Sequence, residues 1–371
     1  MIYFDNAATS FIKPESVYKA VYKTMRFYAG NPGRSGHRLS MIANDIIYNA
    51  RETVAEFFGI KNPDRVCFTN NATTSLNYAI KGILQKKDKV IISAYEHNSV
   101  TRPLCAIDAD VRVVDFLTTE ELYNAAADVK MIIVNHMSNV NGAVADIRKI
   151  GQYARKNNII FMVDASQSAG HISIDVEKDN IDVLACSGHK GLFGPQGTGI
   201  LYIREGIDVR SIIEGGTGSF SERSIQPAVF PDMFEAGTLN VACISGLMEG
   251  VKYINAYGIE KKIADEKVLA DNLLKGLENI PDIDICKAPD NVNCGPLISF
   301  NIRGWDCVTL SNYLSETYDI CVRGGLHCAP LAHKTIGTDK TGTLRVSLSN
   351  FNRICEIEHF LYVIDKTSQM M

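Results

Sequence analysis

A lysine between two glycines follows a short apolar run near the middle of this 371-residue chain. Ile181 to Cys186 is typical of a buried strand, and Ser187-Gly188-His189-Lys190-Gly191 comes directly after it. Lysine rarely lies in a protein interior without a partner, whereas Schiff-base chemistry requires an amine whose pKa is lowered by burial. The pattern therefore predicts that Lys190 holds a carbonyl cofactor. A surface lysine in an ordinary turn is the alternative.

An acid at the end of the preceding apolar run favours the cofactor hypothesis. Ile159 to Val163 has the character of a strand, and Asp164-Ala165-Ser166-Gln167 follows it. In open α/β sheets, ligands bind in the crevice at the carboxyl ends of the strands. The ring nitrogen of pyridoxal phosphate needs such an acid to stay protonated, so that the ring can accept electrons. We expect Asp164 to take this part and Gln167 to donate a hydrogen bond to the phenolic oxygen of the ring.

A phosphate site is expected where a strand at 66–69 leads into a helix that begins near Thr73. The free amides and hydroxyls at a helix N-terminus can bind an anion, although the same hydroxyls also serve as plain helix caps. We expect Ala72 and Thr73 to contact the cofactor phosphate there. Ser187 and His189 are further candidate donors.

Two more strand ends carry polar side chains. His97, after the strand at 90–92, could stack on the cofactor ring and move protons, and Asn139, after the strand at 131–134, could bind cofactor or substrate. Each is also compatible with an ordinary turn. Because polar residues recur at four successive strand ends, we interpret them as one ligand-binding edge.

The elements that position these residues predict an α/β fold. Apolar runs with no polar face indicate a sheet that is covered by helices on both sides. Strands are expected at 66–69, 90–92, 111–114, 131–134, 159–163, 181–186 and 197–204, and helices at 14–25, 42–57, 73–84, from a capping box at Thr118–Glu121, 147–156, 241–257 and 260–277. Strands at 297–302 and 344–349 and a helix at 353–365 predict a smaller α+β part. We place a large cofactor-binding domain at 13–255 and a small domain at 1–12 and 256–371.

Composition narrows the class of protein. The formal net charge is −4, the pI is about 6.1, and basic residues are scattered, so we expect no nucleic-acid partner. Ten cysteines without a Cys-x-x-Cys pair argue against a zinc ribbon or a disulfide framework. No secretion signal or membrane-spanning run is recognisable. A cytoplasmic enzyme is the expectation.

A cysteine lies in the glycine-containing loop Arg323-Gly324-Gly325-Leu326-His327-Cys328-Ala329-Pro330. Positive charge on His327 and Arg323 would favour the thiolate of Cys328. A metal site made of His327, Cys328 and His333 is one alternative, and a buried structural cysteine is another. Neither alternative accounts for the other motifs of the chain.

Taken in order, these segments resemble the motif set of the cysteine desulfurases in the class V aminotransferase family. The loop around Cys328 is short and is similar to the group II branch, which includes selenocysteine lyase. Three positions depart from the family pattern: Asn71 replaces a usual glycine, Thr74 a frequent glutamate, and Leu326 a frequent histidine. The segments that carry the resemblance are Asp5-Asn6-Ala7-Ala8-Thr9, Glu96-His97, Ser138-Asn139, Asp164 to Gln167, Ser187 to Lys190, Phe234-Glu235-Ala236-Gly237-Thr238 and Arg323 with His327-Cys328-Ala329.

The resemblance implies the type I pyridoxal-phosphate-dependent transferase fold, with a mainly parallel sheet in the large domain, and a homodimer. It implies that Thr238 reaches the phosphate of the neighbouring subunit. Lys190, His97 and Cys328 would be catalytic. The substrate would be bound by Ala8, Asn139, Arg323 and Arg345, the last through a planar guanidinium fork on the carboxylate.

The implied reaction converts L-cysteine to L-alanine. Lys190 removes the Cα proton, and the Cys328 thiolate attacks the substrate sulfur and keeps it as a persulfide for an acceptor protein, as in iron–sulfur cluster assembly. Three alternatives stay open: a lyase acting on L-selenocysteine, an aminotransferase or β-lyase that does not use Cys328, and a sulfur carrier or scaffold without catalysis.

Overall fold

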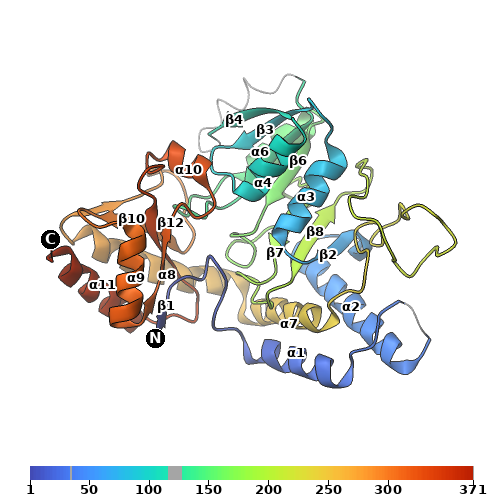
Figure 1. Cartoon of the computed structure of the whole chain (residues 1–371), viewed down its shortest axis with the longest axis horizontal. Coiled ribbons are helices and arrows are strands. Elements are labelled where there is room, and N and C mark those ends of the chain that lie inside the picture. The colour runs from blue at the N-terminus through green and yellow to red at the C-terminus, as the bar shows by residue number, and fades with distance from the viewer. Residues whose placement is uncertain (34–35, 116–127, 371) are drawn as a thin grey trace.

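The computed structural model describes residues 1–33, 36–115 and 128–370 (Figure 1). A large body is built on a seven-stranded sheet, and a smaller body on a four-stranded sheet with a two-stranded pair. Both chain termini lie in the smaller body, where β1 pairs with β11. The N-terminal segment therefore crosses from the small body to the large one.

The large sheet has the strand order β2-β8-β7-β6-β5-β3-β4. Its strands are parallel except β8, which runs antiparallel to both β2 and β7. The carboxyl ends of all the other strands consequently share one edge, and the predicted mainly parallel α/β sheet is confirmed. The strands are β2 Val66–Thr69, β3 Lys89–Ser93, β4 Asp110–Val114, β5 Met131–Asn135, β6 Ile160–Asp164, β7 Val183–Ser187 and β8 Gly199–Ile203.

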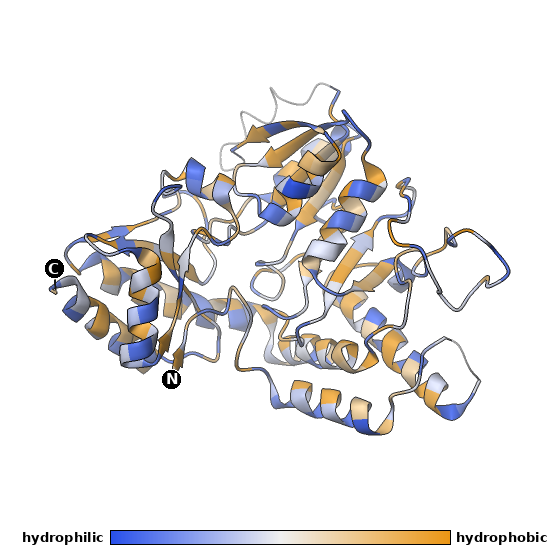
Figure 2. Cartoon of the chain, viewed as in Figure 1, coloured by the Kyte–Doolittle hydropathy of each residue, from blue (hydrophilic) through white to orange (hydrophobic). Residues whose placement is uncertain are grey.

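Helices cover this sheet on both faces, as the continuous apolar strands predict. Side chains on successive positions of a strand point to opposite faces. Ile132 accordingly joins a core with α2, α6 and α7, whereas Ile133 joins a second core with α3 and α4. Figure 2 shows the hydrophobic central strands between these layers. The covering helices are α2 Arg38–Phe57, α3 Ala72–Ile83, α4 Asn98–Ala106, α6 Ile147–Lys156 and α7 Val241–Tyr257.

The small body has the antiparallel order β12-β13-β10-β9. Helices α8 and α11 pack together against this sheet, with α9 beside β12. Its core is a separate cluster that includes Phe4, Phe300 and Phe360. Its elements are β1 Ile2–Tyr3, β9 Ile283–Ile285, β10 Leu297–Ile302, β11 Ile320–Cys321, β12 Arg323–Gly325, β13 Thr343–Ser347, α8 Ile259–Glu278, α9 Cys307–Tyr318, α10 Pro330–Thr335 and α11 Ile354–Ser368.

The chain passes between the bodies at Gly258, whose φ of 90° suits glycine. Helix α7 packs on α2 and on α1 Glu15–Phe27, whereas α8 packs on α11. The domain boundary that we place at residue 255 lies in the last turn of α7 and stays a prediction.

Several short elements were not predicted. β9, β11 and β12 have two or three residues each, too few to show a period, and β12 contains two glycines that are extended only because β13 pairs with them. Helices α4, α9 and α10 were also missed. The helix predicted from the capping box at Thr118–Glu121 lies outside the described residues. Among the described helices, none has the length and apolar character needed to cross a membrane.

Candidate active site

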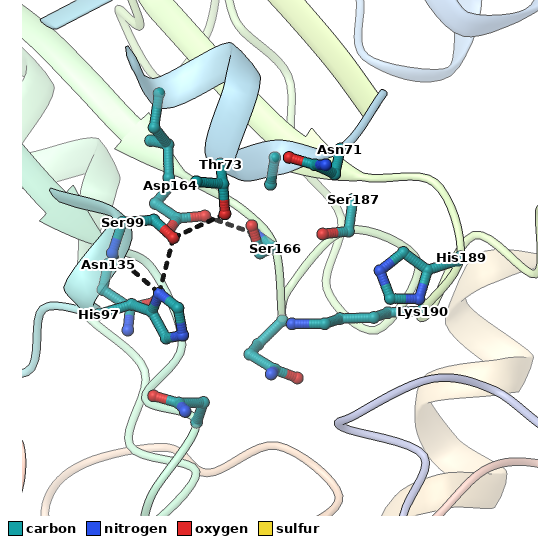
Figure 3. Close-up of a pocket in the computed structure, with 14 residues that line it drawn as sticks. Asn71, Thr73, His97, Ser99, Asn135, Asp164, Ser166, Ser187, His189 and Lys190 are labelled. Atoms are coloured by element: carbon teal, nitrogen blue, oxygen red, sulfur yellow. Dashed lines mark hydrogen bonds between the residues drawn. The ribbon is translucent and has the colours of Figure 1, made fainter. Parts of the chain in front are cut away.

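Polar residues from the carboxyl ends of β2, β3, β5, β6 and β7 border one cavity (Figure 3). The parallel direction of these strands brings their ends together. Every residue predicted to bind the cofactor lines this cavity except Thr238, which is exposed outside it. The lining residues are Asn71, Ala72, Thr73, Leu76, His97, Ser99, Asn135, Asn139, Asp164, Ser166, Gln167, Ser187, His189 and Lys190.

Lys190 extends into the cavity from the side opposite His97 (Figure 3). Burial lowers the pKa of Lys190 to about 8, with Arg345 and Arg323 acting in the same direction and Asp164 opposing them. The flanking glycines make this placement possible, because a Cβ on Gly188 would lie 2.3 Å from the Thr198 hydroxyl oxygen and one on Gly191 would lie 2.3 Å from the Ala169 carbonyl oxygen. The result is an amine that is easier to deprotonate than an ordinary lysine.

Asp164 is the last residue of β6 and is buried. One carboxylate oxygen accepts a hydrogen bond from the Ser166 backbone N–H at 2.9 Å. Among the described residues, no cation lies within ion-pair distance of this carboxylate. A buried acid facing a cavity without a cationic partner fits the protonated ring nitrogen of pyridoxal phosphate.

His97 is held in one orientation by the start of α4. Its Nδ1 accepts a hydrogen bond from the Ser99 backbone N–H at 3.0 Å, so the neutral ring carries its proton on Nε2. The Ser99 hydroxyl bonds the same nitrogen and the Thr73 hydroxyl, at 2.9 and 2.8 Å (Figure 3). Burial lowers the pKa of His97, with Asp164 opposing this effect and Lys190 adding to it, which favours the neutral ring that is suited to stacking.

The N-terminus of α3 faces the cavity through Ala72 and Thr73. Asn71 caps this helix, because its side-chain oxygen accepts from the Thr74 backbone N–H at 2.9 Å. The two departures from the family pattern at this site, Asn71 and Thr74, thus contact each other. Across the cavity, His189 has a pKa lowered to about 4 by burial and contacts the Thr9 hydroxyl at 3.0 Å.

The N-terminal segment joins the site from the small body. The Gln167 side chain donates to the Ala7 carbonyl at 3.0 Å, so part of its amide is engaged by this segment. Asp5 accepts from Arg345 Nη2 at 3.0 Å, and Arg345 Nη1 donates to the Asn139 carbonyl at 3.0 Å. The Nε of Arg345 is buried and lacks a partner among the described residues, as a ligand carboxylate would require. Of the residues predicted to bind substrate, Asn139 lines the cavity, whereas Ala8, Arg323 and Arg345 do not.

Cys328 is exposed and reaches the site through backbone contacts. Its carbonyl accepts from the Asn98 backbone N–H at 2.9 Å, next to His97. Arg323 Nη2 lies 3.9 Å from the sulfur, so one predicted basic neighbour is in place. The predicted charge on His327 is wrong, because burial lowers its pKa to about 2.

The Nε2 of His327 contacts Thr343. Among the described residues, no cluster of three or more histidines, cysteines or acids is arranged to bind a metal. The alternative metal site made of His327, Cys328 and His333 therefore has no support in the geometry.

Sequence reasoning missed several contributors: Leu76, Ser99, Asn135 and Ser166, which line the cavity, Asp5, which binds Arg345, and the hydrogen-bonding role of Glu96. Ser99 lies two residues after His97, a spacing typical of a helix cap. Glu96 is fully buried and accepts from the Ser93 hydroxyl and the Asn135 backbone N–H, both at 2.6 Å. It joins the ends of β3 and β5 beneath His97, which only the sheet order reveals.

Comparison with known proteins identifies the family. The model described as aminotransferase class-V matches residues 2–360. The chain belongs to this family. A probable cysteine desulfurase of Pyrococcus abyssi is 34% identical over 99% of this chain and 94% of the relative. The cysteine desulfurase IscS of Shewanella loihica is 31% identical over 99% of this chain and 92% of the relative.

Solved structures agree with this class V assignment. The apo structure of a cysteine desulfurase from Thermococcus onnurineus NA1 superposes with a TM-score of 0.93, at 31% identity, over 100% of this chain and 95% of that one. The cysteine desulfurase CsdA of Escherichia coli gives 0.88 at 27% identity, with the same coverage. The predicted family and type I fold are confirmed.

Proposed function

We propose that this protein is a pyridoxal-phosphate-dependent cysteine desulfurase that converts L-cysteine to L-alanine and keeps the sulfur as a persulfide on Cys328. One observation carries the proposal. An amine of lowered pKa, Lys190, lies in the cavity, and an exposed thiol, Cys328, lies outside its lining but next to it, because the Cys328 carbonyl is bonded to the residue after His97. A transaminase needs the amine alone, whereas desulfuration needs both nucleophiles.

The cavity residues fit pyridoxal phosphate. Lys190 would hold its aldehyde carbon, Asp164 its ring nitrogen and His97 a ring face. Thr73 and the N-terminus of α3 would hold the phosphate. When bound, the cofactor accepts the electron pair left at the substrate Cα.

Substrate binding is assigned to both bodies. Arg345 is oriented by Asp5 and by the Asn139 carbonyl, which leaves its Nε for the carboxylate of L-cysteine. Arg323 supplies a second positive charge beside Cys328. Ala8 and Asn139 would border the substrate.

The chain's own groups then carry out the chemistry. The Lys190 amine takes the proton from Cα. The Cys328 thiolate attacks the substrate sulfur, an S–S bond forms, and the C–S bond breaks with its electron pair left on carbon. Cβ takes up one proton, which balances the proton that the Cys328 thiol lost on becoming a thiolate, and Lys190 returns its proton to Cα, which yields alanine. The exposed Cys328 remains accessible to an acceptor thiol of another protein.

A homodimer is part of the proposal. Exposed apolar side chains gather on α1 and α2, a pattern that marks interaction surfaces. Thr238, exposed outside its own cavity, would then serve the phosphate of the partner. Sedimentation should give twice the chain mass of 40.9 kDa; a monomer with full activity would contradict this assignment. The exposed residues are Tyr18, Tyr22, Met25, Phe27, Leu39, Met41 and Tyr48.

The deciding experiment assays purified, cofactor-loaded protein for alanine and sulfide from L-cysteine with a reductant, beside the variant Cys328→Ala. The wild type should make both products and the variant neither. Equal activity of the variant would favour a lyase or aminotransferase that does not use Cys328. Turnover of L-selenocysteine but not of L-cysteine would favour the selenocysteine lyase, and absence of any turnover a carrier or scaffold.

A further inference from the structure

The backbone of the cysteine loop has an unusual conformation. His327 and Cys328 have φ values of 48° and 57°, so two consecutive residues with side chains lie in the left-handed region. This region costs free energy for residues other than glycine and persists only where the surroundings enforce it. Released from its contacts, the loop would relax and the thiol would move.

Two hydrogen bonds to backbone carbonyls hold the loop against the large body. Asn139 Nδ2 donates to the His327 carbonyl at 2.7 Å, and the Asn98 backbone N–H donates to the Cys328 carbonyl at 2.9 Å. Both donors belong to the cofactor edge of the large sheet. They attach the loop on one side only.

The His327 side chain supplies the attachment on the other side. The ring is buried, and its Nε2 lies 3.1 Å from the Thr343 carbonyl oxygen and 3.0 Å from the Thr343 hydroxyl. A carbonyl oxygen only accepts, so Nε2 carries the proton and donates. Thr343 begins β13, the strand that pairs with β12 and carries Arg345. The residue before Cys328 is thereby bonded to the small-body sheet.

His327 is poorly suited to act as an acid or base on Cys328, although its Nδ1 is buried and has no hydrogen-bond partner among the described residues. Burial lowers its pKa to about 2, and the neighbouring Arg345 of β13, His333 of α10 and Arg323 of β12 disfavour a charged ring further. Its donating nitrogen is occupied by Thr343. What remains for the side chain is a geometric task.

We propose that His327 is a positioning residue for Cys328: its ring bonds the loop to β13 and keeps the left-handed conformation that holds the thiol beside Arg323. The inference rests on the proposed function, since it concerns the thiol that receives the sulfur. The proposal concerns only one of the two nucleophiles: His327 positions Cys328 and has no such role for Lys190.

Two substitutions at His327 test this role. His327→Leu introduces an apolar side chain of similar bulk and removes the hydrogen-bond donor. His327→Gln places an amide N–H near the position of Nε2. We expect His327→Leu to lower alanine formation from L-cysteine by at least about tenfold, since a misplacement of about 1 Å can cost a hundredfold. His327→Gln should retain most of the activity. His359→Leu, at an exposed position of α11, is the matched control.

Two further measurements separate positioning from general damage. Exchange of the Cα hydrogen of L-alanine in D₂O needs Lys190 but not Cys328, and we expect His327→Leu to retain it within about twofold. In cofactor-free protein, alkylation of Cys328 should slow several-fold relative to Cys355, an exposed cysteine of α11, because the thiol loses Arg323 as a neighbour. Peptide mapping quantifies each cysteine.

The outcomes distinguish the two proposals. If the wild type forms no alanine, the proposed function fails whatever the variants do. If the wild type is active and His327→Leu matches it, or loses Cα exchange as strongly as desulfuration, the positioning role is wrong. Should His327→Leu fail to fold, His327→Asn gives the same test, because its amide is too short to reach Thr343.

Discussion

At the scale of single residues, the site depends on groups whose pKa values are shifted by burial. Lys190 is an amine with a pKa of about 8, and Glu96 beneath His97 is an acid with a pKa raised to about 8. Each pKa shift changes the free energy of unfolding with pH, because the same groups have ordinary pKa values in the unfolded chain. The buried groups of this site therefore lower the stability of the folded protein.

Replacing Lys190 by methionine should stabilise the cofactor-free protein. Below about pH 8 the folded state holds a buried positive charge on Lys190, which lowers the free energy of unfolding. This destabilisation disappears as the pH rises from about 8 to 10.5, because the folded lysine loses its proton before the unfolded one does. We expect Lys190→Met to gain about 1–3 kcal/mol in urea unfolding at pH 7 and to lose this gain at pH 10. Desulfuration should disappear entirely. A gain that is independent of pH would contradict this account.

Replacing Glu96 by glutamine tests whether this acid is neutral. Desolvation, with Asp164 as a further cause, raises its pKa to about 8, so the folded protein loses stability as the pH rises from about 4.5 to 8. Glu96→Gln keeps the acceptor for Ser93 and Asn135 and removes this loss. Relative to wild type, the variant should be unchanged or weaker at pH 4 and stronger by about 1–3 kcal/mol at pH 8. Thermal unfolding across this range measures the difference; a variant weaker at every pH would mean that Glu96 is ionised.

At the scale of elements, Asn71 at the N-terminus of α3 has two roles, capping the helix and bordering the expected phosphate site, and one substitution can distinguish them. Asn71 caps the helix and also lines the cavity where the phosphate is expected. An aspartate would still accept from the Thr74 N–H, but its charge would repel a phosphate. The same residue type caps the short 3-10 helix Pro63–Arg65, where the Asn62 side-chain oxygen accepts from the Asp64 N–H at 3.1 Å.

We expect Asn71→Asp to weaken pyridoxal phosphate binding by about tenfold or more while changing the free energy of unfolding by less than about 1 kcal/mol. Titration of cofactor-free protein with pyridoxal phosphate measures the affinity. Asn62→Asp, at an exposed helix cap outside the residues of the cavity, should leave the affinity unchanged. Equal weakening in both variants would show that overall charge, not the helix end, is responsible.

At the scale of the whole molecule, a buried ionic cluster joins the two bodies. Glu266 of α8 accepts from Lys262 at 2.5 Å and from His171 at 2.8 Å, and His171 follows β6 of the large sheet. Lys262 and Glu266 are almost fully buried. A buried pair contributes little by itself, but removal of one partner leaves an uncompensated charge.

Glu266→Gln should therefore destabilise the protein by about 3–5 kcal/mol, because Lys262 loses its counter-charge. Asp271→Asn provides the control on the same helix, since the pair with Lys267 is exposed and worth less than about 1 kcal/mol. Urea unfolding at pH 7 compares the two. Similar small losses in both variants would mean that water or another group satisfies Lys262.

The α/β class, the family and the order of the site motifs can all be predicted from the amino-acid sequence. Continuous apolar runs such as Met131–Asn135 are unambiguous because both faces of the strand are buried. Asp164, Ser187 and Lys190 were predicted because each follows such a run. Cys328 was singled out by the glycines and basic residues of its loop, and the family resemblance assigned roles to it and to Arg345, which no periodicity marks.

The charge states and the mutual contacts of the polar residues could not be predicted from the sequence, because they depend on residues that are distant in the chain. The neutral state of His327 follows from burial and from Arg345, which is distant in sequence. The contacts of Asp5 with Arg345 and of Glu96 with Asn135 depend on which strands become neighbours. Short strands such as β12 are extended only because a partner pairs with them. Local sequence gives the residue types and the spacing of apolar residues, from which helices and strands are predicted. The charge states of side chains and their contacts arise only where distant elements pack together.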